Sequence, residues 1–182
     1  MIGIYIGNTV GRRSSSGCDE EKKKVIVYKD WFLPSLYELD SMYGNLFLFG
    51  LGGFRDDFYW TSSEATYQYV YEIRFRDRLT VTGSKTGITC CRPCRSFNSG
   101  KSYNFRDIGP AGGLIFWNIG GLYFESSMVD LGVSTWSNIV DVAVTDTHIE
   151  RGTGQANTLK IMNQVGHVNS AAKLCADYSV EI

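Results

Sequence analysis

Three cysteines that lie close together in the sequence offer the most direct route to chemistry. Cys91 and Cys94 have the CxxC spacing of thiol–disulfide redox sites and zinc knuckles, and Cys90 precedes them. A redox CxxC normally begins a helix, because the helix N-terminus lowers the pKa of the thiol. We expect a strand over residues 88–95 instead, and on a strand residues i and i+3 point to opposite faces. The pattern therefore disfavours a redox site.

A metal site would need ligands from other parts of the chain. Zinc could draw only on the remaining thiols and the two imidazoles: Cys18, Cys90, Cys175, His148 and His167. The sequence has no second CxxC and no HxxxH, the spacings typical of zinc sites. Calcium could bind carboxylates at Asp56, Asp57 or Asp130, but no calcium-binding motif surrounds them. We predict no metal, no cofactor and no catalytic residues, with thiol chemistry as the enzymatic alternative.

The composition is that of one globular domain with a substantial core. The chain has 182 residues, of which 43% are hydrophobic and 14% aromatic. Its net charge of −1 gives no electrostatic reason to expect nucleic acid as a partner. No apolar run approaches the roughly 18 residues of a membrane-spanning helix, so we expect no membrane insertion. The apolar start, residues 1–7, is too short for a secretion signal.

Short strands and a few helices are expected to position these residues. The segment 67–76 alternates aromatic or aliphatic residues at odd positions with mostly polar ones at even positions, which predicts a half-buried strand. Ser35 and Glu38 form a capping box ahead of apolar residues at helical spacing. The expected strands are 1–10, 25–28, 67–76, 79–82, 88–95, 114–117 and 122–125. The expected helices are 35–48, 157–166 and 170–178.

Turns and buried positions complete this outline. Asp77 and Arg78 are expected to form a turn, and Gly120 and Gly121 to connect a hairpin. The helix over 157–166 should bury its apolar side: Leu159, Ile161, Met162 and Val165. The four tryptophans are expected to pack in the core: Trp31, Trp60, Trp117 and Trp136. The predicted fold class is α+β, with small antiparallel sheets and two to three helices.

Several segments together resemble a known family. They are DWFLPSLYELDSMY (30–43), GLGGF (50–54), YWTSSE (59–64), Lys85 and CRPCRSF (91–97). This set is similar to the C-terminal domain of bacterial collagen-like adhesins, a family long catalogued as of unknown function. The resemblance implies a C-type-lectin-like fold. Cys91 and Cys94 stand where that family usually has valines. The calcium-ligating tripeptides of the lectin members do not occur here.

The order of the matching blocks is unusual. Residues 107–178 resemble the usual N-terminal half of the family, and residues 25–97 resemble its usual C-terminal half. We interpret residues 1–182 as a single circularly permuted domain, with 1–24 as an N-terminal extension that has no family counterpart. Loop 95–107 would then join the usual first and last strands, which pair antiparallel in this fold. The alternative is a piece of a tandem array, completed by domain swapping between chains.

The resemblance also suggests a ligand-binding face. Relatives of this family include variable proteins of diversity-generating retroelements, whose variable positions form one exposed face on a constant scaffold. Residues 55–90 mix framework positions with others whose types suit such a face. These others are Arg55, Asp56, Asp57, Thr66, Tyr67, Tyr69, Glu72, Arg74, Arg76, Asp77, Arg78, Thr80, Thr82, Thr86, Thr89 and Cys90. An ordinary polar strand face is the alternative for these residues.

We therefore predict a non-catalytic binding and display module. It would contact a protein or glycan on another cell or particle, from an extracellular, cell-surface or virion location. In its sharpest form it is a retroelement-diversified variable protein; the milder form is an undiversified adhesin-type glycan-binding domain. Arg74, Arg76 and Arg78 would suit sulfated or carboxylated glycans. A formylglycine-generating-type enzyme that uses the cysteines is a further alternative.

Overall fold

The computed structural model describes residues 24–182, and it contains mixed α and β structure as predicted. The strand expected at 1–10 lies outside the described residues. The helices are α1 (Leu36–Asn45), the 3-10 helix η1 (Phe47–Phe49), α2 (Gly154–Met162) and α3 (Ala171–Ala176). The strands are β1 (Val27–Tyr28), β2 (Phe58–Glu64), β3 (Tyr69–Arg74), β4 (Leu79–Ser84), β5 (Ile88–Cys90), β6 (Cys94–Asn98), β7 (Leu114–Ile119), β8 (Leu122–Ser126), β9 (Val133–Thr135) and β10 (Val180–Glu181). None of the helices in this part of the chain is long and apolar enough to cross a membrane.

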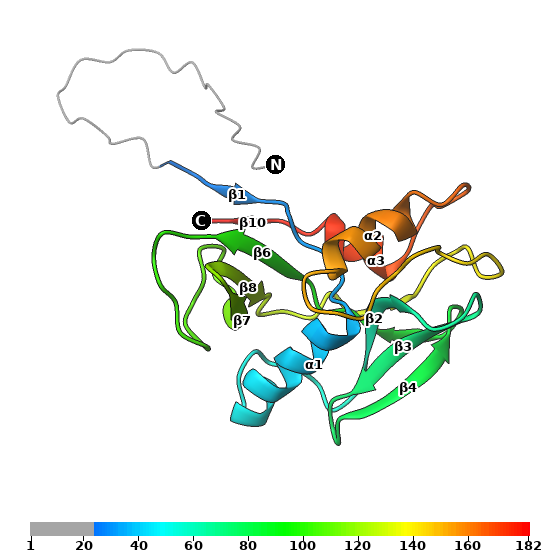
Figure 1. The fold of residues 1–182 in the computed structure, drawn as a ribbon, viewed down its shortest axis with the longest axis horizontal. Coiled ribbons are helices and arrows are strands. Elements are labelled where there is room, and N and C mark those ends of the chain that lie inside the picture. Colours follow the sequence, from blue (N-terminus) through cyan, green and yellow to red (C-terminus); the bar gives the residue numbers. More distant parts are fainter. Residues whose placement is uncertain (1–23) are drawn as a thin grey trace, which may run out of the picture.

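The larger sheet has five strands in the order β4-β3-β2-β5-β9. Its neighbours pair antiparallel except β2 and β5, which run parallel where Tyr59 faces Cys90. Tyr59 is buried in one hydrophobic cluster and the adjacent Trp60 in another, so β2 is covered on both faces. The first cluster lies under α1, and the second joins the sheet to α2 and α3. Figure 1 shows α1 and the α2–α3 pair on separate sides of this region.

The smaller sheet has three strands in the order β6-β8-β7. The hairpin predicted at Gly120 and Gly121 connects β7 to β8, and both glycines have positive φ. The family resemblance predicts that the segment 107–117 pairs with the strand that is now β6. This prediction is wrong, because β8 lies between β7 and β6. A hairpin partner follows β7 after only two residues and occupies the edge that β6 would have needed.

The strand expected over 88–95 is two strands in two different sheets. β5 belongs to the five-stranded sheet and β6 to the three-stranded one, with Arg92 and Pro93 between them. Proline has no N–H to donate to a ladder, which favours a break at this point. The buried Arg92 guanidinium holds the break in place by donating to the carbonyl oxygens of Gly52 and Ser127, each at 2.7 Å.

α1 and α3 begin within one residue of the predicted positions, α2 begins three residues earlier, and all three end earlier than predicted. Ser35 and Glu38 make the capping box of α1, and Ser170 caps α3. The second helix covers 154–162 and not 157–166, so the prediction of its apolar side is partly wrong. Val165 lies beyond the helix and is 97% exposed, while Ile161 is fully buried. Leu159 is also exposed, because it lies on the outer side of α2.

The two ends of the described chain meet. β1 and β10 form a small antiparallel sheet, and Ile26 and Ile182 exchange two backbone hydrogen bonds of 3.0 Å. In Figure 1 the blue β1 lies beside the red β10. The tryptophan prediction holds for Trp31, Trp60 and Trp136, which are buried; Trp117 is partly buried at the edge of the first cluster.

Candidate functional site

The sixteen residues predicted to form one binding face are divided by the pleat of the sheet. Along β3, Ile73 points into the cluster under α1, whereas Glu72 and Arg74 point to the opposite side. Thr80 pairs with Ile73 and therefore shares the α1 side. The two ends of β3, a strand of six residues, are about 17 Å apart at the usual rise per residue. The predicted residues therefore form separate groups and not one face.

Their exposure also differs. Most of the sixteen are exposed: Arg55, Asp56, Asp57, Thr66, Tyr67, Tyr69, Arg76, Asp77, Arg78, Thr80, Thr82 and Thr86. Glu72 and Arg74 are half-buried. Thr89 and Cys90 are buried, contrary to expectation, because β5 is flanked by β2 and β9 and Cys90 lies in the cluster under α1.

The arginines at the β3–β4 turn are already paired. The Arg74 guanidinium donates to both carboxylate oxygens of Asp77, at 2.9 and 2.6 Å. Arg78 donates in the same bidentate way to Asp40 of α1, at 2.8 and 2.9 Å. Arg78 has a positive φ of 60°, which fits the predicted turn. Within residues 24–182, only Arg76 of the three predicted arginines lacks a carboxylate partner, so this end is poorly suited to a polyanionic glycan.

The opposite end of the hairpin borders a small polar hollow, which we call the tyrosine hollow. It has a volume of about 150 Å³ and is lined by Gln68, Tyr69, Ser84, Thr86, Val140 and Asp141. Ser84 and Thr86 hydroxyls lie 2.9 Å apart. An exposed tyrosine ring, hydroxyls, an amide and a carboxylate thus converge around one space. Tyr69 and Thr86 were predicted from the sequence; the other lining residues were not.

A buried ion pair fixes the far wall of this hollow. Lys85 and Glu64 are both almost completely buried and contact each other directly. The Lys85 ammonium also donates to the carbonyl oxygen of Val142 at 2.9 Å, and Glu64 Oε2 accepts from the Val144 N–H at 2.8 Å. Both partners therefore hold loop 139–146 against the sheet, and Lys85 further lies 5.0 Å above the Trp136 ring.

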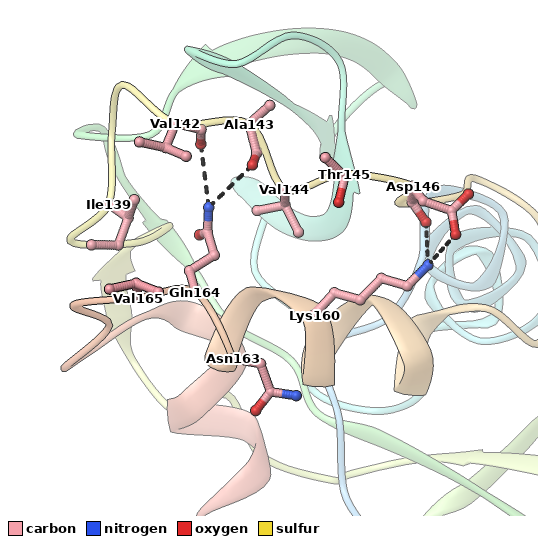
Figure 2. Close-up of a pocket in the computed structure, with 10 residues that line it drawn as sticks. All are labelled: Ile139, Val142, Ala143, Val144, Thr145, Asp146, Lys160, Asn163, Gln164 and Val165. Atoms are coloured by element: carbon pink, nitrogen blue, oxygen red, sulfur yellow. Dashed lines mark hydrogen bonds and ion pairs between the residues drawn. The ribbon is translucent and has the colours of Figure 1, made fainter.

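A second and larger hollow lies on the other side of loop 139–146. Its volume is about 560 Å³, and it is bounded by that loop and by the end of α2 (Figure 2). The Gln164 side-chain amide donates to the carbonyl oxygens of Val142 and Ala143, at 3.3 and 3.4 Å. At the other end of this hollow, the Lys160 ammonium donates a hydrogen bond to the Asp146 carboxylate, with Nζ 2.7 Å from Oδ2. Nothing in the sequence pattern indicated this hollow, because its walls carry no motif and come from distant segments.

The half-buried Glu72 carboxylate is the most unusual charge of the predicted set. It accepts a hydrogen bond of 3.2 Å from the Thr89 hydroxyl and has no cationic partner within the described residues. A β-carbon at Gly83 on the neighbouring strand would come within 3.0 Å of it. Burial raises the pKa of Glu72, and the nearby negative charge of Asp57 raises it further.

The cysteines do not form a chemical site in the part of the chain that is described. Cys91 lies in the cluster that joins α2 and α3, whereas Cys94 lies in the cluster under α1, so the two thiols of the CxxC point apart. Burial raises the pKa of Cys91 to about 12, and it also raises the pKa of Cys94 and Cys175. Across residues 24–182, no three His, Cys, Asp or Glu side chains gather as a metal site would require.

Comparison with known proteins identifies no relative of this chain. No family model, no curated protein and no solved structure matches it.

Proposed function

We propose that the chain is a non-catalytic binding module whose ligand contacts lie around the tyrosine hollow. The observation that carries this proposal is the convergence of the Tyr69 ring with the hydroxyls of Ser84 and Thr86 and the Asp141 carboxylate. Tyrosine supplies a large contact area at a low entropic cost, and the polar groups around it can fix the orientation of a ligand. A glycan residue or a polar protein loop would suit this combination.

Rigidity around the hollow supports the same proposal. Loop 139–146 is held by the buried pair of Lys85 and Glu64, so Asp141 is presented from a fixed backbone. A preorganised site loses less conformational entropy when a ligand binds. The buried thiols favour binding over cysteine-based catalysis, because a buried thiol with a raised pKa supplies little thiolate.

We further propose a C-type-lectin-like fold in permuted order, displayed on a cell surface or a virion. The meeting of β1 with β10 supports this, because a permuted domain requires new termini at one surface location. In a retroelement-diversified form, natural variants should differ at exposed positions such as Tyr67, Tyr69 and Thr86. Thr89 and Cys90 should then vary less than these, because they are buried.

The proposal is tested by screening the protein on a glycan array and on a display library of peptides. Tyr69→Ala and Asp141→Asn should each weaken the best ligand by about tenfold, a typical effect for a central contact residue. Thr80→Ala is the matched control, because Thr80 is exposed on the same hairpin but does not line the hollow. An equal loss of ligand affinity in all three variants would show that the ligand does not bind at the hollow.

A further inference from the structure

A second surface, separate from the tyrosine hollow, combines exposed and partly buried aromatic rings with arginines. It includes parts of α1, η1, the segment before β7, β7 itself and the segment before α2. We call it the aromatic–arginine patch, and it consists of Tyr37, Phe49, Phe105, Arg106, Trp117 and Arg151. Figure 1 shows α1 beside β7, which brings these segments together.

Stacking contacts connect the members of the patch. The Arg151 guanidinium lies 4.2 Å from the Trp117 ring centroid and 5.9 Å from that of Tyr37. Phe105 stacks on Trp117 with ring centroids 6.2 Å apart. Arg106, the next residue, places its guanidinium 4.2 Å from the Phe49 ring centroid. Both guanidiniums therefore lie within cation–π distance of an aromatic ring, which favours a fixed position for each.

The charges of these two arginines are not matched by carboxylates. Within residues 24–182, Arg106 and Arg151 form no ion pair, although Asp107 and Glu150 are their neighbours in sequence. Arg151 makes one side-chain hydrogen bond to a described residue, from Nε to the Ser41 hydroxyl at 2.6 Å. Arg74 and Arg78, by contrast, each have a bidentate carboxylate partner. Among the described residues, the terminal guanidinium nitrogens of Arg151 and the whole Arg106 guanidinium therefore have no hydrogen-bond acceptor, and they can bind an anionic ligand.

The backbone at Arg106 has an uncommon conformation. Its φ is +76°, a conformation that costs a non-glycine residue free energy. Backbone hydrogen bonds hold it: the Arg106 N–H donates to the Ile115 carbonyl at 2.8 Å, and the Ile115 N–H donates to the Asp107 carbonyl at 2.9 Å. This conformation belongs to the turn before β7, and from that turn the Arg106 guanidinium lies over the exposed Phe49.

We propose that the aromatic–arginine patch binds a protein partner through acidic side chains that lie next to an apolar anchor. Exposed aromatic residues and arginines are the types that dominate the centre of protein interfaces. Two guanidiniums that have no carboxylate partner among the described residues favour carboxylates as their complement. Nucleic acid is the less favoured class of ligand, because the chain has a net charge of −1 and offers only two such cations at the patch.

Two synthetic peptides test this inference. Both contain phenylalanine and alanine, and the positions between these residues are glutamate in one peptide and lysine in the other. The protein should bind the glutamate peptide in fluorescence anisotropy and should not bind the lysine peptide. Combined Arg106→Gln and Arg151→Gln substitutions should weaken the glutamate peptide by about tenfold or more. The double variant Arg106→Lys and Arg151→Lys keeps the charge but not the planar fork. Its affinity for the glutamate peptide should lie between those of the unaltered protein and the double glutamine variant.

Controls separate this surface from the proposed ligand site. Arg76→Gln removes an exposed arginine outside the patch and should leave peptide affinity unchanged, as should Tyr69→Ala. Thermal unfolding of every variant verifies that it is folded. Equal binding of both peptides, or an unchanged affinity in the folded glutamine variant, overturns the inference. Tighter binding of oligothymidylate or of a heparin-derived oligosaccharide than of the glutamate peptide also overturns it, because the patch would then serve a different class of ligand.

Discussion

The Glu38 carboxylate lies against the backbone of Gly154 so closely that a β-carbon there would come within 2.2 Å of Oε2. Glu38 is completely buried in α1, yet its carboxylate accepts the N–H of Ser35 at 2.7 Å and of Gly152 at 2.8 Å. One side chain therefore caps its own helix and anchors the segment that begins α2. The two sequence blocks, 25–97 and 107–178, are joined through this contact.

This geometry predicts a strong effect of Gly154→Ala. The added methyl group would meet the Glu38 carboxylate, the Ser35 backbone nitrogen and the Phe32 ring. We expect a loss of about 2–3 kcal/mol in the free energy of unfolding, as is typical of overpacking. Gly44→Ala is the control, because no atom lies within 4 Å of its β-carbon position and alanine favours the helix interior; it should stabilise the protein by about 0.5–1 kcal/mol. Urea unfolding measures both, and an undiminished stability in Gly154→Ala would contradict the contact.

Removing the charge of Lys85 should destabilise the protein and release loop 139–146. Lys85→Met leaves the buried Glu64 carboxylate without its partner, and we expect a cost of about 3–5 kcal/mol. Lys173→Met, which breaks the exposed pair with Asp177, should cost less than about 1 kcal/mol. Hydrogen exchange at the Val144 amide gives a local measurement, since that N–H donates to Glu64. Unchanged protection of Val144 would show that the pair does not hold the loop.

The raised pKa of Glu72 predicts a pH-dependent contribution to stability. A carboxyl group whose native pKa lies above its unfolded value stabilises the fold at low pH, and this contribution is lost as the pH rises through the native pKa. At pH 7, above the unfolded pKa, the desolvated Glu72 carboxyl should therefore destabilise the fold. Glu72→Gln should raise the unfolding temperature at pH 7 and change it little at pH 4. A variant that is stabilised equally at both pH values would exclude Glu72 as the titrating group.

The four described cysteines should be inert in the folded protein. Cys90, Cys91, Cys94 and Cys175 are free and buried, and burial raises the pKa of each thiol. In a Cys18→Ser background, a disulfide reagent at pH 8 should react only on the timescale of unfolding. Denaturant should then make all four thiols react quickly. One thiol that reacts fast in the native state would revive the enzymatic alternative.

Features that depend on neighbouring residues could be predicted from the amino-acid sequence. The capping box of Ser35 and Glu38, the turn at Arg78 and the hairpin at Gly120 and Gly121 are all present as predicted. Each of these follows from hydrogen bonds or backbone preferences within about four residues, so the local pattern is sufficient. The burial of Trp60 and Trp136 follows similarly from their size and apolar surface.

Features that depend on partners far along the chain became visible only in the folded structure. Arg78 is paired because Asp40, 38 residues away, lies beside it, and Cys90 is buried because β5 lies between β2 and β9. The division of 88–95 into two strands and the start of α2 at Gly154 have the same origin, since Arg92 and Glu38 take backbone partners from distant segments. Sequence periodicity records which side of a segment is apolar, but it does not record which distant segment will cover that side.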